Sequence, residues 1–512
     1  MNNETPANAP LWRGGLALVA IPLLLLVALG AWAVASPAGS SPDDDFHMTS
    51  IWCGAGERPG FCESVPGVPN ERAVPALVLE AADCFKANPN ISAACQASDP
   101  AHPDALVQTA RGNFVGAYPT VFYSVMAPFV GADVTASVVT MRVVNVVLFL
   151  AIGTALYLLL PARRRPTLML AWLIGLVPLG IFLITSTNPS GWAVISAGTV
   201  WLATLGFFES TRWRAAGLAV LAGIGVVMGA GARADAAIYA GIAIVLATLL
   251  AFDGRSRTFW LKTIVSVGLG LLAVALFLSS RQGSIASTGF SGHSSPASVP
   301  TIDLIVGNLQ EVPELWAGAF GFWGLGWLDT IMPAAVWVTA GAAFAAVAFM
   351  GLRSMDWRKG IALLAVFGAL VFFPTWILVQ SKTFVGFEVQ PRYILPLIVM
   401  LGGVAIVQRG MPALRFTITQ FAVLGAGLVL ANALALHANM RRYISGQSTL
   451  DWNLNHFVQW WWPVGPGPMV VWALGSAAFA GAVALVLLEL HRRQNDTADT
   501  QRAGAEGLLS VR

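Results

Sequence analysis

The chain has 512 residues, of which 56% are hydrophobic and 11% are charged, and its formal net charge is +3. Soluble domains carry about 25% charged residues, so this composition excludes a soluble protein and predicts an integral membrane protein. The small net charge and the lack of a basic tract argue against a nucleic-acid partner. The mean hydropathy of +0.69 agrees with a chain that lies mostly in lipid.

The first apolar segment, residues 14–35, is long enough to cross a bilayer as a helix. The small-residue sequence AVASPAGS at its end is similar to a cleavage site, so a cleaved signal peptide is the alternative. We expect a retained first helix that follows a cytoplasmic segment at residues 1–13.

Twelve apolar runs of membrane-spanning length follow one another along the chain. They lie at residues 14–35, 137–160, 167–185, 191–208, 215–231, 234–252, 259–279, 331–350, 360–380, 393–408, 416–437 and 467–489. The sequence therefore predicts an all-α polytopic membrane protein of about 12 helices, with helices 2–7 in residues 137–280 and helices 8–11 in residues 331–437.

Basic clusters occur at every second boundary between these runs. They are ARRRP (162–166), TRWR (211–214), DGRSR (253–257), RSMDWRK (353–359), QRGMPALR (408–415) and HRR (491–493). Positive residues favour the cytoplasmic side, so we expect a plasma-membrane protein with both termini in the cytoplasm and a disordered tail at residues 490–512. The long segments 36–136, 281–330 and 438–466 then face outward, where we expect the function to lie.

All four cysteines lie in the segment 36–136, which is predicted to face outward. An even number in one exported segment predicts two disulfides, and the pairs Cys53–Cys62 and Cys84–Cys95 each close a short loop. A zinc site is the alternative, but these spacings do not match the close cysteine pairs of zinc sites.

The same segment begins with the acidic sequence PDDDFH, residues 42–47. Carboxylates at a bilayer exit can simply keep the chain solvated, which is one interpretation. Asp44 and His47 are three residues apart, and on a helical turn such residues share a face. They would then form a general base or, with Asp43, a site for a divalent cation such as Mg²⁺ or Mn²⁺.

Ionisable residues recur at other outward boundaries. Arg233 and Asp235 stand beside a tight helical hairpin, where charged groups usually line a cavity, although an arginine can also extend to the lipid surface. Residues at i and i+2 do not share a helical face, so their spacing does not predict an ion pair. Asp329 precedes a predicted helix and either caps it or belongs to a site.

The entrance of a later helix carries four more candidates, Lys382, Glu388, Arg392 and Tyr393. The planar fork of Arg392 suits a phosphate, and Lys382 adds a second positive charge nearby.

Four other outward residues have simpler interpretations. We interpret Tyr118 and Tyr123 as interfacial anchors rather than substrate contacts. Arg441 and Arg442 oppose the expected charge bias of that face, which suggests a local role such as binding a lipid phosphate.

Four sequence blocks carry a resemblance to a known family. PDDDFH resembles the P-D-E-x-x-H motif of the polytopic membrane family catalogued as domain of unknown function 2142. STNPSGW (186–192), GFWGLGWLDTIMP (321–333) and VQPRYILPL (389–397) resemble three further blocks of that family, in the same order. Asp44 stands where the family usually has Glu, and Pro391 where it usually has Gly. The motif singles out Asp43, Asp44 and His47 and leaves Asp45 as the bystander.

That family in turn resembles the C-type glycosyltransferases, polytopic enzymes that take a sugar from a polyprenyl-phosphate donor. The resemblance implies a similar fold and an inverting transfer to a cell-envelope glycan or lipid acceptor, in contact with membrane lipids. Asp44 or Asp43 would be the base, and Arg392, Arg233 and Lys382 would bind the donor phosphate. The alternatives are a transporter or flippase and a non-catalytic assembly protein for envelope polysaccharide.

Overall fold

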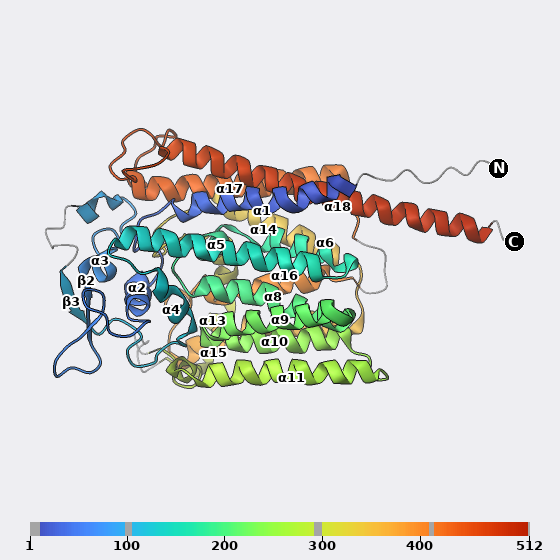
Figure 1. Ribbon diagram of the computed structural model, residues 1–512, viewed down its shortest axis with the longest axis horizontal. Helices are drawn as coiled ribbons and strands as arrows, with labels where there is room; N and C mark the ends of the chain where they lie inside the picture. The colour runs from blue at the N-terminus through green and yellow to red at the C-terminus, as the bar shows by residue number, and fades with distance from the viewer. Residues whose placement is uncertain (1–10, 98–104, 291–298, 409–413, 510–512) are drawn as a thin grey trace.

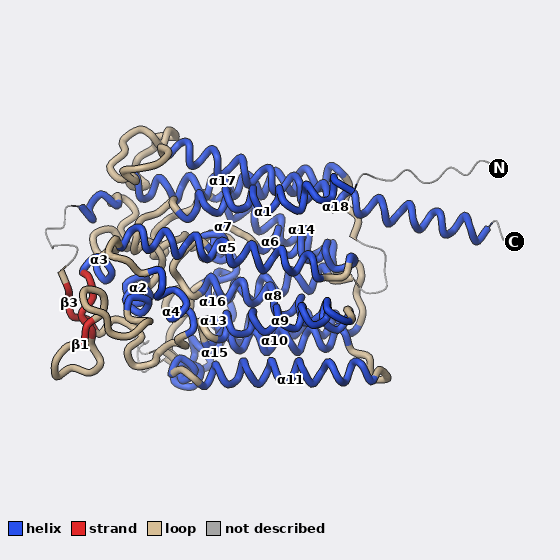
Figure 2. The backbone as a smooth tube through the Cα atoms, in the orientation of Figure 1, coloured by secondary structure: helices blue, strands red, loops and turns tan. Residues whose placement is uncertain are grey.

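The computed structural model describes residues 11–97, 105–290, 299–408 and 414–509, so most of the predicted segment 1–13 lies outside the described residues. Its long helices run side by side in one bundle (Figure 1), and nearly all of its regular structure is helical (Figure 2). The bundle helices are α1 (Leu11–Ala33), α5 (Val134–Leu159), α6 (Arg165–Gly175), α7 (Pro178–Ile184), α8 (Ser190–Glu209), α9 (Arg212–Ala230), α10 (Ala234–Ala251), α11 (Arg257–Leu278), α14 (Ala334–Gly351), α15 (Trp357–Gln380), α16 (Pro391–Ile406), α17 (Ile418–Ile444) and α18 (Pro468–Leu509).

Shorter elements connect them. These are the helices α2 (Asp44–Trp52), α3 (Ala76–Glu80), α4 (Val121–Met126), α12 (Ile285–Thr288) and α13 (Thr301–Ala319), the 3₁₀ turns η1 (Ala93–Ala97), η2 (Ala127–Phe129), η3 (Ala162–Arg164) and η4 (Arg281–Ser284), and the strands β1 (Glu63–Ser64), β2 (Arg72–Pro75) and β3 (Leu106–Thr109).

Among the described residues, nine helices are long and apolar enough to cross a membrane, and the bent pair α6 and α7 makes a tenth candidate. The helices α1 and α16 supply two shorter apolar segments, Ala17–Ala33 and Pro391–Ile406. These elements follow the order of the predicted apolar runs. The prediction of an all-α polytopic membrane protein is confirmed, while the count of twelve spans stays a prediction.

The two ends of the bundle differ in composition. α1 begins and α18 ends at the same end of the bundle, which we call the "basic end" (Figure 1). There Arg164 pairs with Glu209 at 2.6 Å and donates to the carbonyl of Gln408, which brings predicted basic boundaries together. Residues 36–97 and 105–133 lie at the opposite end, the "loop end" (Figure 1).

The predicted helix 167–185 is broken. α6 ends at Gly175, α7 begins at Pro178, and the two axes differ by 96°. Proline lacks a backbone N–H but suits the first turn of a helix, so Pro178 starts a new helix instead of extending α6. The turn after α7 thereby reaches the loop end.

Three further features depart from the sequence-based expectations. Segment 36–136 contains a small antiparallel sheet of order β1-β2-β3, and segment 281–330 contains the helix α13. The tail predicted to be disordered continues α18 as far as Leu509, which its alanine, glutamine and glutamate residues favour.

Both disulfides form with the predicted pairing, Cys53–Cys62 and Cys84–Cys95, which excludes the zinc alternative.

Of the nine candidate spans found among the described residues, α8 is the most buried, with 94% of its apolar window inside the structure. The neighbouring helix α9 approaches it through glycines: a Cβ at Gly225 would come within 2.9 Å of Val200, and one at Gly229 within 2.3 Å of Ser196. Small residues allow such close packing in lipid, where helices gain little from burying apolar surface. This contact supports the turn at Arg233, directly after α9.

Candidate functional site

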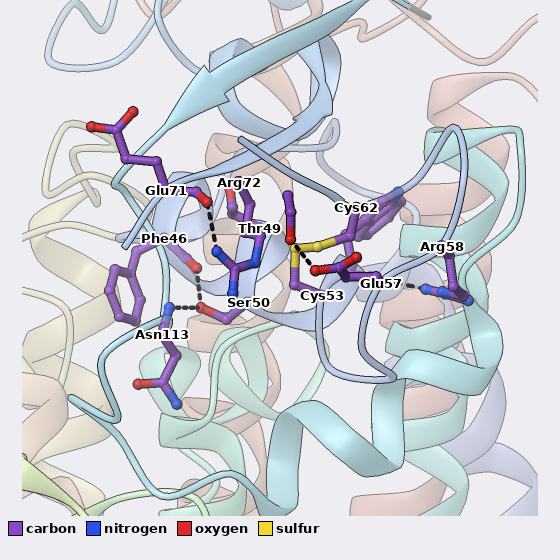
Figure 3. Close-up of a disulfide and its surroundings, with 12 residues drawn as sticks. Phe46, Thr49, Ser50, Cys53, Glu57, Arg58, Cys62, Glu71, Arg72 and Asn113 are labelled. Carbon is purple, nitrogen blue, oxygen red and sulfur yellow. Dashed lines mark hydrogen bonds between the residues drawn. A yellow bond between two sulfur atoms is a disulfide. The ribbon is translucent and has the colours of Figure 1, made fainter. Parts of the chain in front are cut away.

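The site is built around α2, the first helix after α1. Asp43 precedes α2 with a φ of 56°, in the left-handed region that aspartate tolerates better than most residues. The other end of α2 is fixed by the Cys53–Cys62 disulfide (Figure 3). Ser50 accepts a hydrogen bond of 2.9 Å from the backbone N–H of Asn113, which holds the neighbouring segment against α2 (Figure 3).

The carboxylate of Asp43 lies between two arginines from distant parts of the chain. Nη2 of Arg392 donates to Oδ2 at 2.6 Å, and Nη2 of Arg111 donates to Oδ1 at 3.2 Å. Burial by itself would raise the pKa of Asp43, but the neighbouring positive charges, Arg392 first, outweigh it and hold this pKa below its ordinary value. Asp43 is therefore ionised. Because its side chain is 35% exposed, a ligand can reach this carboxylate.

Arg392 is the second residue of α16, where the helix dipole disfavours a positive charge and the carboxylate of Asp43 offsets it. Nη2 of Arg392 also donates to Oη of Tyr393 at 3.1 Å. Its Nε and Nη1 are buried, and neither has a hydrogen-bond partner among the described residues. Unused N–H groups on a buried guanidinium can bind an anion.

Arg233 lies against the same tyrosine. Its guanidinium carbon is 4.5 Å from the ring centroid of Tyr393 and 5.9 Å from that of Tyr118. Nε and Nη2 of Arg233 donate to the two oxygens of Asp235 at 2.9 and 2.8 Å. The pair forms despite its i, i+2 spacing because Arg233 caps α10 with extended backbone angles, outside the helical geometry.

A pocket of about 70 Å³ opens beside Arg233, between α10, α15 and α16. Its polar side chains are those of Tyr118, Arg233, Asp235, Tyr239, Gln282 and Tyr393. Much of the rest of the lining is formed by Phe277, Phe290, Phe373, Pro374 and Ile377. A ligand that is polar at one end and apolar at the other matches this lining.

Asp44 does not line this pocket. It is fully buried, and its two oxygens accept hydrogen bonds from the backbone N–H of Ser41 at 2.9 Å and from Oγ1 of Thr187 at 2.8 Å. Burial raises the pKa of Asp44 to about 6, partly opposed by the charge of Arg142. Asp44 therefore joins α2 to the turn after α7 and is not open to a ligand in this conformation.

His47 is also buried, with Nδ1 3.0 Å from Oη of Tyr123. Burial lowers the pKa of His47 to about 3, so the imidazole is neutral at physiological pH. The ring packs edge-on against Phe46 and Tyr118. The interpretation of the two tyrosines as interfacial anchors is therefore wrong: Tyr123 is buried beside His47, and Tyr118 lines the pocket.

The predicted cation site does not fit this arrangement. Within the described residues, no three His, Cys, Asp or Glu side chains are placed to hold a metal ion. The oxygens of Asp43 face two guanidinium groups, and those of Asp44 are taken up by Ser41 and Thr187. A cation at Asp43 would have to displace positive charges that are already there.

Asp45, which the sequence motif left as a bystander, is joined to Asp43 through Arg111. Nε and Nη2 of Arg111 donate to its two oxygens at 3.0 and 3.1 Å, so Arg111 bridges Asp45 and Asp43. Sequence reasoning missed Arg111, which follows β3 with no motif around it.

Two residues that hold the segment before α2 were also missed, although the sequence around each offered a clue. Arg142 is an arginine within an apolar run, and it donates to the carbonyls of Ser36 and Pro37, both at 2.7 Å. Asn188, in the block STNPSGW, donates to the carbonyl of Pro42 at 2.7 Å. Together they fix the chain between α1 and α2.

Asp329 lies outside the pocket and does not cap α14, whose N-cap is Pro333. Its carboxylate accepts from Nη2 of Arg442 at 2.7 Å in a buried ion pair. Arg442 also donates to the carbonyl of Phe85, and Arg441 donates to the carbonyl of Asn453 at 2.9 Å. Arg442 thus anchors the segment around Phe85, and Arg441 anchors the loop after α17. These structural roles take the place of the suggested binding of a lipid phosphate.

Two candidates lie in the turn before α16. Lys382 is exposed, and among the described contacts none joins it to Asp43, Arg392 or Arg233. Glu388 is half-buried in the same turn. The structure thus brings together Asp43, Arg392, Tyr393, Arg233 and Asp235 of the predicted set.

The fold and this site define a polytopic membrane protein with an ionic cluster and an amphipathic pocket at one end of its helical bundle. The chain belongs to the family of predicted membrane proteins known as DUF2142, whose model matches residues 25–401. The match covers PDDDFH and the three other blocks that resembled this family. No curated protein and no solved structure matches the chain.

Proposed function

We propose that this protein is a plasma-membrane glycosyltransferase that moves a sugar from a polyprenyl-phosphate donor to an envelope glycan or lipid acceptor. The observation that carries the proposal is the chain of contacts from the accessible carboxylate of Asp43 through Arg392 and Tyr393 to Arg233 at the amphipathic pocket. Such a transfer requires a base, positive charge for a phosphate, and an apolar surface for the lipid chain.

Sidedness follows from charge. The basic end is the cytoplasmic side under the positive-inside rule, so both termini are cytoplasmic in this proposal and the reaction takes place outside, at the loop end. Segments at the loop end also carry the two disulfides, which require an oxidising compartment.

The acceptor hydroxyl oxygen attacks the anomeric carbon of the donor sugar. The bond between that carbon and the phosphate oxygen breaks, polyprenyl phosphate leaves with the bonding electrons, and the hydroxyl proton passes to the carboxylate of Asp43. Attack opposite the leaving group inverts the anomeric configuration. Arg392 and Arg233 offset the negative charge that develops on the phosphate.

The low pKa of Asp43 suits this sequence of events. Without donor, Arg392 keeps the carboxylate ionised. A bound phosphate adds negative charge beside Arg392, which raises the pKa of Asp43 and makes it a stronger base when the acceptor arrives. Asp44 and His47 position α2 in this scheme and do not touch the reacting atoms.

The test uses the purified full chain in lipid nanodiscs with a panel of polyprenyl-phosphate sugars and envelope acceptor fractions. Transferred sugar and released polyprenyl phosphate are both measured. We expect Asp43→Asn to lower kcat/KM by about 100-fold or more. The matched control, Asp83→Asn, changes an exposed carboxylate in the same outward segment and should leave the rate within about twofold.

Undiminished transfer by folded Asp43→Asn would overturn the assignment of the base. Movement of intact lipid-linked sugars across sealed vesicles, without transfer, would replace the proposal by a flippase. A folded wild-type protein that does neither with any donor would favour the non-catalytic alternative.

A further inference from the structure

A second pocket lies in the half of the bundle near the basic end, and it shares no lining residue with the pocket beside Arg233. It has a volume of about 150 Å³ and is lined by α1, α5, α6 and α18. The lining includes Ile21, Leu25, Phe149, Trp172 and Val483, and its few polar side chains are Thr154, Tyr157 and Glu489. These four elements are apolar segments of the bundle, so the groove lies at the level of lipid tails.

Positive charge gathers around the polar end of this groove. The guanidinium carbons of Arg165 and Arg493 lie 5.0 and 5.7 Å from the ring centroid of Tyr157. Arg165 is close enough to Arg214 and Arg493 for their charges to interact, and Glu489 supplies one negative charge to the group.

Among the side chains that the structure describes around Arg165, one carboxylate, that of Glu489, faces three arginines. Arg493 pairs with Glu489 at 2.8 Å. Arg165 has one long hydrogen bond, 3.4 Å from Nη2 to the carbonyl of Leu158, and its Nε has no partner among the described residues. An apolar groove that ends at an excess of guanidinium groups is complementary to a lipid with an anionic headgroup.

We propose that this groove binds one acyl chain of an anionic phospholipid from the leaflet at the basic end, with the headgroup at Arg165, Arg214 and Arg493. The proposal does not depend on the glycosyltransferase function. Apolar contacts alone would give little selectivity, because the surrounding lipid tails are as apolar as the groove. Selectivity therefore comes from the headgroup, at about fivefold per arginine, which corresponds to about 1 kcal/mol.

Gly153 allows the groove to be filled without disturbing the fold. It lines the groove, and a Cβ at this position would meet no atom within 4 Å. Gly153→Phe therefore places a ring where the acyl chain would lie, and Gly153→Leu is a smaller version. The matched control is Gly368→Phe on α15, where a Cβ also meets no atom within 4 Å and the residue is exposed outside the groove.

The experiment is native mass spectrometry of the full chain released from nanodiscs that contain equal amounts of phosphatidylglycerol and phosphatidylcholine. We expect the wild type to retain one phosphatidylglycerol and Gly153→Phe and Gly153→Leu to lose it. Arg165→Gln should lower the preference for phosphatidylglycerol about fivefold. Gly368→Phe and Arg255→Gln, an exposed arginine of the basic boundary 253–257, should match the wild type.

Equal retention of the two lipids by the wild type would overturn the proposal. Retention of phosphatidylglycerol by both Gly153 variants at the wild-type level would overturn it as well. Thermal unfolding of each variant confirms that a lost lipid reflects a filled groove and not an unfolded chain.

Discussion

The guanidinium of Arg392 lies 2.6 Å from the carboxylate of Asp43, although the two residues are 349 positions apart in the chain. The contact joins the start of α16 to the start of α2. Arg392 is 2% exposed and Asp43 is 35% exposed, so a buried positive charge supports an accessible negative one. This arrangement predicts how substitutions at the site behave.

Arg392→Lys keeps the positive charge but removes the planar fork that contacts Asp43 and Tyr393 together. We expect kcat/KM for a polyprenyl-phosphate sugar to fall about 100-fold, because the charge on the leaving phosphate is no longer met by oriented N–H groups. Steady-state kinetics in nanodiscs checks this. Arg72→Lys on the small sheet is the matched control, and equal rates in both variants would contradict the role of Arg392.

His47 predicts a pH dependence of stability. Its pKa is about 3 in the folded protein, whereas in the unfolded chain it protonates below its ordinary value of 6.5. The contribution of His47 to the free energy of unfolding is therefore fully present above pH 6.5 and is lost as the pH falls toward 3. At pH 5 this loss amounts to about 2 kcal/mol. His47→Gln should flatten the fall of Tm between pH 7.5 and about pH 5.

Asp44 acts in the opposite direction, because its raised pKa makes the folded state lose stability as the pH rises through about 6. The wild type and His47→Gln both keep Asp44, so the difference between their curves of Tm against pH reports the contribution of His47 alone. Parallel curves for the wild type and His47→Gln would contradict this prediction.

The Asp329–Arg442 ion pair is buried on both sides. Arg442→Met should lower the free energy of unfolding by about 3–5 kcal/mol, because it leaves a buried carboxylate and the carbonyl of Phe85 without their donor. Thermal or denaturant unfolding in detergent measures the loss. Lys86→Met, which breaks the exposed pair with Asp83, should cost less than about 1 kcal/mol, and similar losses in both would count against the buried pair.

The two disulfides should differ in their effect on activity. Each closes a short loop, and removing either should lower the free energy of unfolding by about 2–3 kcal/mol. Cys53 directly follows α2, so replacing Cys53 and Cys62 by serine should also reduce transfer, by loosening the helix that Asp43 precedes. Replacing Cys84 and Cys95 should leave transfer near the wild-type rate, and an equal loss in both would contradict this link.

The membrane spans could be predicted because each helix satisfies its own backbone hydrogen bonds in lipid, so length and apolarity decide them locally. Proline also acts locally, yet the break at Pro178 was not predicted, because the residues around it are as apolar as those of a continuous span. The disulfide pairing followed from loop length alone.

The candidate site was predictable in part. Asp43, Arg392, Arg233 and Tyr393 stood out as polar residues at the boundaries of apolar runs. Arg111 did not, because no hydrophobic pattern surrounds it and its partners are 66 and 68 residues away.

The sequence by itself therefore determined the class of protein, the order of its spans and the short loops closed by disulfides, since these depend on neighbours along the chain. Only the tertiary structure decided that Asp43 is accessible while Asp44 is buried against Thr187, and that Arg392 rather than Lys382 meets the carboxylate. Adjacent side chains point in different directions, and what each one meets depends on helices that are distant in sequence and brought together by packing.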